Sequence, residues 1–170
     1  MVALLRGINV GGHRKVPMAV LRQAAEEIGF DAPRTYVASG NLVFGSGTYC
    51  ASAEARLEHE LEQRFGFRID VVARTAEQWS GYCRSNPFPA ESARAANLVM
   101  LVIGKQPADD AGLAALRARA TGEERVERRG DAMWIWFANG AGRSKLGLTA
   151  GRGVWTSRNW RTVTALRDML

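Results

Sequence analysis

Short apolar runs alternate with amphipathic segments along the first half of the chain. Runs of alternating or continuous apolar residues predict strands, and apolar residues at helical spacing predict helices, with Pro17 suited to a first helical turn. We expect Thr48 or Ser52 to cap the second helix and Gly66 to end it. The expected elements are a strand at 2–8, a helix at 17–28, hairpin strands at 34–38 and 42–44, the helix ending at Gly66, and a strand at 67–73.

A similar alternation restarts after a break at 85–89, where two prolines flank Phe88 and cannot continue a helix. Before the break we expect a short helix at 75–83. After it we expect Asp109 to give the next helix an acidic start and Ser157 to cap the last helix. The expected elements are a strand at 97–103, a helix at 109–120, hairpin strands at 125–129 and 132–137, a short strand at 154–156, and a C-terminal helix.

This order of elements predicts an α+β fold. Strand, helix, strand, strand, helix, strand is the split βαβ plan of ferredoxin-like sheets, mainly antiparallel with the helices on one face. We therefore expect two tandem ferredoxin-like halves, the second with a C-terminal helix. The first half would span 1–84 with its connecting helix, the linker 85–89, and the second half 90–170.

Composition limits the function classes more than it selects one. The chain has 170 residues and 46% hydrophobic content, enough to bury a core, and a formal net charge of +6. Lysine occurs only at 15, 105 and 145 among the 23 basic residues. Because such an arginine bias can reflect codon usage, the positive charge is weak support for a nucleic-acid partner.

Cysteine and histidine usage argues against a disulfide scaffold and against a metal centre. Cys50 and Cys83 are too few for a scaffold and form no CxxC pair, and His13 and His59 stand apart from them. We expect no metal and no cofactor. We also expect a cytoplasmic protein without a membrane partner, because no leader pattern and no apolar run of about 18 residues is present.

Several motifs together resemble a known bacterial family. They are Leu5-Arg6-Gly7-Ile8-Asn9-Val10-Gly11-Gly12 with Val16-Pro17-Met18, Tyr36-Val37-Ala38-Ser39-Gly40-Asn41-Leu42-Val43-Phe44, Asn86-Pro87-Phe88-Pro89, Gly142-Arg143-Ser144-Lys145-Leu146 and Thr156-Ser157-Arg158-Asn159-Trp160. The chain resembles domain-of-unknown-function family 1697 through this set. The resemblance implies a cytoplasmic α+β protein of the tandem ferredoxin-like kind, without an established activity.

The best candidate site is the glycine-rich turn after the first strand. Glycines and a nearby helix start favour an anion, because backbone N–H groups can approach it closely. If the first strand and the following hairpin are neighbours, their ends gather one set of ligand-binding candidates. That set is Arg6, Gly7, Asn9, Gly11, Gly12, Lys15, Ser39, Gly40 and Asn41.

Each of these candidates also has a structural interpretation. The glycines can serve a tight connection that needs positive φ, Arg6 can form a salt bridge, and Asn9 and Asn41 can satisfy local backbone groups. Two later clusters add a second set of candidates, which can equally be a solvated basic surface. That set is Arg143, Ser144, Lys145, Arg158 and Asn159.

Known nucleotide and RNA motifs are missing or incomplete. The turn lacks the GxxxxGK[ST] and GxGxxG patterns, so P-loop hydrolysis is disfavoured. Trp134 and Trp136 suggest base stacking as in an RRM, but the partner strand 97–103 has no aromatic residue, which favours a core role for both rings.

Three functional hypotheses remain open. The leading one is a non-catalytic binding module for a phosphorylated or otherwise anionic ligand, with nucleic acid as one such ligand. The second is an enzyme on a small phosphorylated substrate, with His13 as the acid or base. The third is a scaffold that forms homo-oligomers through a sheet edge or through Phe88 and the tryptophans.

Overall fold

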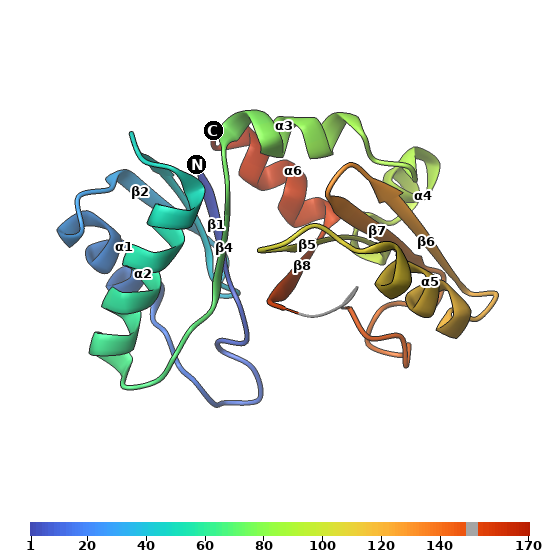
Figure 1. Ribbon diagram of the computed structural model, residues 1–170, viewed down its shortest axis with the longest axis horizontal. Helices are drawn as coiled ribbons and strands as arrows, with labels where there is room; N and C mark the ends of the chain where they lie inside the picture. The colour runs from blue at the N-terminus through green and yellow to red at the C-terminus, as the bar shows by residue number, and fades with distance from the viewer. Residues whose placement is uncertain (149–152) are drawn as a thin grey trace. The chain divides into compact units, whose positions relative to one another are not determined.

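The computed structural model describes residues 1–148 and 153–170, in which two four-stranded sheets and six α-helices form an α+β structure (Figure 1). The strands are β1 (Val2–Leu5), β2 (Asp31–Tyr36), β3 (Asn41–Gly45), β4 (Val71–Arg74), β5 (Val99–Gly104), β6 (Glu124–Arg129), β7 (Ala132–Phe137) and β8 (Trp155–Asn159). The helices are α1 (Met18–Glu27), α2 (Cys50–Phe65), α3 (Ala76–Arg84), α4 (Pro89–Arg94), the 3₁₀ turn η1 (Ala96–Leu98), α5 (Asp110–Arg119) and α6 (Trp160–Asp168). Across these two ranges, none of the helices has the length and apolar character that a bilayer span requires.

Contacts within the chain define two compact units. The first unit contains Met1–Trp79 and Leu166–Leu170, and the second contains Ser80–Ala165. Helices α3 and α6 therefore contribute residues to both units. The linker that we expect at 85–89 follows α3 directly and ends at the first residue of α4. The division of the chain into 1–84 and 90–170 stays a prediction.

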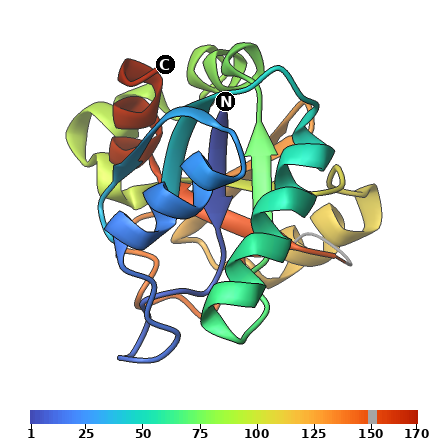
Figure 2. The ribbon, with the colours of Figure 1, turned by 90° about the vertical axis from the view of Figure 1, so that its left-hand side faces the viewer.

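The first sheet has the strand order β2-β3-β1-β4, and every neighbouring pair is antiparallel. β1 lies in the centre, with Leu4 opposite Asn41 on one side and Val72 on the other. Helices α1 and α2 lie side by side over one face (Figure 2), where buried Leu21 and Leu57 pack into one core with alternate strand residues. The pairing of β1 with β3 places the turn that precedes β3 beside the end of β1.

Both outer edges of the first sheet are closed. The carboxylates of Glu58 and Glu54 on α2 accept the outward backbone N–H groups of Val71 and Ala73 at 2.8 and 2.7 Å. At the opposite edge, β2 contains Pro33 and a register shift, two features that discourage the addition of another strand. Neither edge therefore offers a regular row of free backbone groups.

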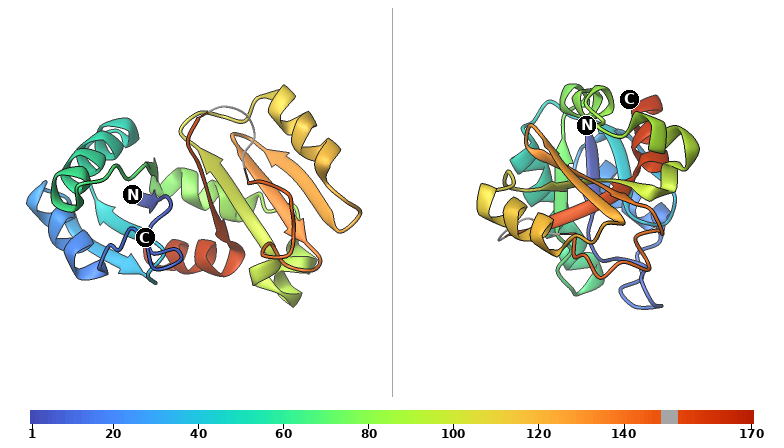
Figure 3. Two further views of the ribbon diagram at one scale, coloured as in Figure 1. Left: turned by 90° about the horizontal axis from the view of Figure 1, so that it is seen from below. Right: turned by 90° about the vertical axis from the view of Figure 1, so that its right-hand side faces the viewer.

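The second sheet has the corresponding order β6-β7-β5-β8, again with antiparallel neighbours. Helix α5 lies against one face (Figure 3), where Leu116 packs with Met133 and Ile135 of β7. The alternate residue Trp134 points to the other face, and its ring centroid lies 5.6 Å from that of Trp160 on α6. The helices of this unit therefore contact both faces. The helix on the second face is the C-terminal helix, which was expected in addition to the helices on one face, and it supplies the cover that the fully buried Trp134 needs on that side.

Two helix termini follow the sequence signals. α2 ends at Gly66, which has φ of 72° and donates its N–H to the Glu62 carbonyl at 2.9 Å. The side chain of Asp109 accepts the N–H of Gly112 and so caps the start of α5. Both residues satisfy backbone groups that would otherwise have no partner at a helix end.

Two predicted caps are wrong. The residue before α2 is Tyr49, and no side chain caps this end, since Thr48 lies one position too early and Ser52 lies inside the helix. Ser157 belongs to the extended strand β8, which continues to Asn159 and leads directly into α6. The Asn159 carboxamide oxygen accepts a first-turn N–H of α6 at 3.0 Å and is the actual cap.

The proline-rich break leads into a helix that the pattern did not reveal. The Asn86 carboxamide oxygen accepts the Phe88 N–H at 2.9 Å, and its nitrogen donates to the Ser92 hydroxyl at 2.8 Å. Pro89 then stands at the start of α4, where its missing N–H costs no hydrogen bond. The segment from Asn86 to Pro89 is therefore a helix start.

Candidate functional site

The glycine-rich segment after β1 forms a small hairpin. The His13 N–H donates to the Val10 carbonyl at 3.1 Å, and these two residues form an antiparallel bridge. Gly11 and Gly12 between them have φ of 60° and 79°, as a type I′ turn requires, and Gly7 has φ of 65°. The interpretation that these glycines provide positive φ for a tight connection is confirmed. The hairpin then leads back to Pro17 and α1.

Asn9 holds the base of this hairpin. Its side-chain oxygen accepts the Val16 N–H at 2.9 Å, while its nitrogen donates to the Val16 carbonyl at 3.0 Å and to the Ala38 carbonyl at 2.7 Å. Its own N–H donates to the Arg14 carbonyl at 3.2 Å. One carboxamide thus ties the hairpin to the turn between β2 and β3, as the structural interpretation of Asn9 requires.

A hollow of about 410 Å³ lies between the hairpin, the start of α1 and the β2–β3 turn. The hollow is open to solvent, and most of its wall is apolar. Its volume lies within the range of about 300–1,000 Å³ for small-molecule sites. The lining residues are Asn9, Gly12, Lys15, Val16, Pro17, Met18 and Ala38.

Lys15 is the only charged side chain on this wall. It is exposed, and it forms no ion pair with any residue that the structure describes. Beside it, α1 begins at Met18 with neither a side-chain cap nor an acidic residue in its first turn. The first N–H groups of the helix and the Lys15 ammonium therefore give this end of the hollow a positive potential.

Backbone strain and exposed apolar residues gather around the same loops. Val37 has φ of 47° although it is β-branched, and Asn9 and Arg14 have φ of 55° and 50°. Val37 and Val10 are 54% and 69% exposed. Exposed apolar side chains at strained loops are typical of places where a ligand or partner makes contact.

The turn residues of the candidate set lie where the sequence predicts, but mostly inside the fold. The Leu5 N–H donates to the Gly40 carbonyl at 2.8 Å, which joins β1 to the turn. Asn41 is fully buried and donates to the Tyr36 carbonyl and to the Ser39 hydroxyl, each at 2.9 Å. Ser39 is exposed. Gly40 and Asn41 therefore shape the loop from within, and Ser39 stands on its surface.

Arg6 emerges at the end of β1 and finds an acidic partner. Its guanidinium lies 3.4 Å from the Asp70 carboxylate, which also pairs with Arg68 at 3.1 Å. The Arg6 backbone N–H donates to the Asp70 carbonyl at 2.9 Å. The interpretation of Arg6 as a salt-bridge residue is confirmed. It does not line the hollow.

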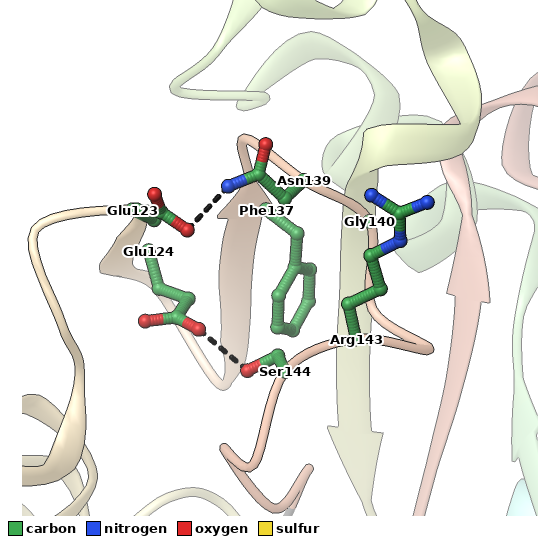
Figure 4. Close-up of a pocket in the computed structure, with 7 residues that line it drawn as sticks. All are labelled: Glu123, Glu124, Phe137, Asn139, Gly140, Arg143 and Ser144. Carbon is green, nitrogen blue, oxygen red and sulfur yellow. Dashed lines mark hydrogen bonds between the residues drawn. The ribbon is translucent and has the colours of Figure 1, made fainter.

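The second predicted set lies in the second unit, where one of its loop residues, Ser144, contacts a carboxylate. The Ser144 hydroxyl donates to the Glu124 carboxylate at 2.6 Å, and Asn139 donates to Glu123 (Figure 4). These groups and exposed Arg143 line a cavity of only about 40 Å³. Hydrogen bonds from Ser144 and from Thr121 lower the pKa of Glu124. Because two carboxylates line so small a cavity, it disfavours a phosphate. Lys145 is exposed and does not line it.

Arg158 and Asn159 belong to β8 and not to a loop. Arg158 donates to the Thr156 hydroxyl at 3.0 Å and to the Ser157 carbonyl at 2.7 Å. Burial lowers the pKa of Arg158 to about 10, because the charged form is less well solvated inside the protein. With Asn159 capping α6, both side chains have structural tasks.

The described residues present little catalytic chemistry. His13 lies exposed at the tip of the hairpin, without a hydrogen-bonded serine, cysteine or carboxylate side chain. Neither Cys50 nor Cys83 is in a disulfide bond, and burial raises the pKa of Cys50 away from a reactive thiolate. Among residues 1–148 and 153–170, no three potential metal ligands gather.

Five residues of the hollow region were not among the predicted site residues, namely Val16, Pro17, Met18 and Ala38, which line it, and Val37, the strained residue beside it. A half-buried methionine in a first helical turn has no distinguishing pattern, and nothing in the sequence signals positive φ at a valine. The one available signal was the predicted topology, which places the turn after the first strand beside the turn of the following hairpin.

Comparison with known proteins identifies a family and a fold. The conserved bacterial protein SP0830 from Streptococcus pneumoniae matches with a TM-score of 0.76 and 24% sequence identity, over 99% of this chain and 96% of that chain. This likeness shows a shared fold. No curated protein matches the sequence. A family model described as "Protein of unknown function (DUF1697)" matches residues 1–134, which include the hairpin and the hollow. The chain therefore belongs to the DUF1697 family.

Proposed function

We propose that this protein is a non-catalytic binding module for a small anionic ligand, phosphorylated or carboxylated, that occupies the hollow of the first unit. The observation that carries the proposal is the position of Lys15, an exposed cation without an ion-pair partner among the described residues, beside the uncapped start of α1. Cations and helix N-terminal N–H groups are the donors that bind phosphate and carboxylate oxygens.

The wall chemistry indicates how such a ligand would lie. Its anionic group would contact Lys15 and the first N–H groups of α1. Its less polar part would cover Val16, Pro17 and Met18, which form much of the apolar wall. The Met18 thioether adapts to flat or irregular surfaces, so a ring would pack well against it. A ligand with both parts uses the hollow better than inorganic phosphate does.

A thermal-shift screen of the full chain tests this proposal. Nucleotides, sugar phosphates, organic carboxylates, inorganic phosphate and short oligonucleotides are each added at low and at physiological salt. A ligand at a hundred times its Kd stabilises the native state by about 2.7 kcal/mol, which raises Tm by several degrees. We expect a salt-resistant shift from a small anion with an apolar part.

Two variants locate the site. Lys15→Gln removes the cation, and Met18→Trp fills the hollow, so each should abolish the shift. Lys105→Gln in the second unit removes the same kind of charge and should leave it intact. Equal shifts in wild-type protein and Lys15→Gln would contradict the proposal.

Other outcomes favour the other hypotheses. A shift from oligonucleotides alone that collapses as salt rises indicates binding through counterion release, and then nucleic acid is the partner. Turnover of a bound phosphorylated compound that is lost in His13→Ala would support the enzyme. The absence of any shift would leave the scaffold.

We infer that the two sheets are tandem ferredoxin-like halves. The support is the strand order, in which the first strand of each half lies between the third and the fourth. We also propose a cytoplasmic location, supported by the low cysteine content of the chain, whose two cysteines form no CxxC pair. A bacterial origin, expected from the resemblance, stays a prediction.

A further inference from the structure

Among the described residues, no strand pairs with the outer edge of β6, and the outward-facing groups that are bonded there, the Glu124 N–H and the Val126 and Arg128 carbonyls, meet only the Thr121 carbonyl and arginine side chains. Glu123 bonds to Ala138 across the hairpin at 2.9 Å, so odd-numbered β6 residues bond to β7 and even-numbered ones face outward. The Arg117 guanidinium reaches the Val126 carbonyl from outside at 3.1 Å, which agrees with this assignment. The strand is regular, without proline or bulge. It differs in this from the closed edges of the first sheet.

The order of charges along this edge is complementary to that of a second, antiparallel copy of the same strand. The segment reads Glu123-Glu124-Arg125-Val126-Glu127-Arg128-Arg129. If a second copy lies antiparallel with Val126 opposite Val126, each residue on one side of the centre meets an opposite charge. The three pairs are Glu123 with Arg129, Glu124 with Arg128, and Arg125 with Glu127, and each occurs twice by symmetry.

Neighbouring registers lack this match. Centring the pair on Arg125 places Arg125 opposite its own copy and Glu123 opposite Glu127. Centring it on Glu127 places Glu127 opposite its own copy and Arg125 opposite Arg129. Like charges directly opposite each other destabilise a strand pair, so only the Val126 register is favoured among these three.

The backbone geometry allows the same register. Val126 faces outward, so two copies centred there exchange a pair of N–H to carbonyl hydrogen bonds, and residues 124 and 128 form the next pairs. Arg117 must release the Val126 carbonyl first. Its other contact at this edge is a long ion pair with Glu127 at 3.7 Å, and its side chain is 49% exposed. Its displacement breaks one hydrogen bond and one weak contact. Residues 124 and 128 then pair once the Glu124 N–H leaves the Thr121 carbonyl and the Arg128 carbonyl leaves the Arg129 side chain.

We propose that the β6 edge is a homodimer interface, in which a second copy of this chain adds its β6 antiparallel across Val126 to form a continuous eight-stranded sheet. The proposal does not involve the hollow of the first unit. Two edge strands bury less surface than a standard interface, and exposed ion pairs are screened by salt. The dimer is consequently weak and salt-sensitive.

Sedimentation equilibrium of the full chain over a concentration series, at low and high salt, tests the proposal. We expect concentration-dependent dimers that weaken as salt rises. Val126→Pro removes the central outward N–H but keeps the bonds to β7, so it should raise the dissociation constant about tenfold or more. Thermal melting shows whether this variant is folded.

A charge swap tests the register without altering the backbone. Arg129→Glu creates two like-charge contacts and should weaken the dimer about tenfold at low salt, whereas Glu123→Arg combined with Arg129→Glu should restore it. Arg161→Glu makes the same charge reversal at an exposed position of α6 and should leave the dissociation constant unchanged. The proposal is overturned if the wild-type protein stays monomeric or if Arg129→Glu leaves the dissociation constant unchanged. It is also overturned if the double variant fails to restore association.

Discussion

The two units share a strand order but differ in where strained backbone, exposed charge and a regular strand edge lie. In the first unit the sheet edges are closed by Glu54, Glu58 and the irregular β2, while the loops hold strain and an exposed lysine. In the second unit the loop residue Ser144 bonds to the carboxylate of Glu124 at the start of β6, while the β6 edge is regular. Topology alone therefore does not decide which surface binds a ligand or partner.

Strain makes the contrast sharper. Among residues 1–148 and 153–170, all four non-glycine residues with positive φ lie in the first unit: Asn9, Arg14, Ala32 and Val37. The described part of the second unit contains positive φ only at glycines. Strained backbone persists where the surrounding contacts impose it, and it is frequent at functional sites. The first unit is thus the better place to look for ligand chemistry.

The largest expected effect comes from Gly40 in the hairpin of the first unit, and Gly130 in the hairpin of the second unit provides the comparison. A Cβ at Gly40 would lie 2.7 Å from the Leu5 Cβ and 2.8 Å from the Ile8 Cδ1, at φ of 76°, so Gly40→Ala should lower the free energy of unfolding by about 3 kcal/mol. Gly130→Ala has φ of 60° but open space and should cost only about 1 kcal/mol. Urea denaturation followed by circular dichroism measures both.

Gly47→Ala serves as the control for this pair, because its Cβ would meet nothing within 4 Å and its φ is not positive. It should change stability by less than about 0.5 kcal/mol. Equal losses for Gly40→Ala and Gly130→Ala would show that the close approach of the turn to β1 has no energetic weight.

A smaller effect is expected at the closed edge of β4. Glu54→Ala leaves the buried Ala73 N–H without its carboxylate acceptor and should cost about 2 kcal/mol in chemical denaturation. Glu62→Ala, an exposed position on the same helix, should be nearly neutral. If Glu54→Ala were as mild as this control, the carboxylate would not be what closes the edge.

Relief of strain at Val37 should stabilise the protein. Asparagine tolerates positive φ far better than a β-branched residue, and Val37 is exposed, so Val37→Asn should add about 1 kcal/mol to the free energy of unfolding. The same variant should weaken any ligand that contacts this loop. A loss of stability would mean that the valine side chain makes contacts worth more than its strain.

The smallest expected effect is a pH dependence in the second unit. The folded pKa of Glu124 lies below its ordinary value, so the unfolded chain binds its proton first as pH falls. Stability from Glu124 is therefore present above about pH 4.5 and lost on acidification through the lowered pKa. Glu124→Gln should show a shallower acid decline of Tm than wild type. An equally steep acid decline of Tm in the two proteins would contradict this role of Glu124.

Residues with a local physical effect were predicted best from the sequence. Gly66 ends α2 because glycine adopts the left-handed conformation readily, and Gly130-Asp131 closes the β6–β7 hairpin because two residues suffice for that turn. The neighbouring positions of β1 and the β2–β3 turn followed from the order of elements alone. These features need no knowledge of distant contacts.

Features that depend on context were missed or misassigned. Ser157 was expected to cap α6, but pairing with β5 keeps it in an extended strand, and Asn159 takes the task. The anion-binding interpretation of Ser144 could not include Glu124, which lies twenty positions earlier and meets it only in the folded hairpin. The hollow itself depends on how the Asn9 carboxamide joins two loops, which no local pattern specifies.

The closure of β4 by α2 also affects the rate at which the amide protons of this strand exchange with solvent. Amide protons of an edge strand normally exchange with solvent early, because fraying alone exposes them. Those of Val71 and Ala73 are held by carboxylates on a sixteen-residue helix that packs into the core of the first unit. Their release requires α2 to leave the sheet. In hydrogen exchange β4 should therefore behave as an interior strand, with a lifetime set by the undocking of a helix.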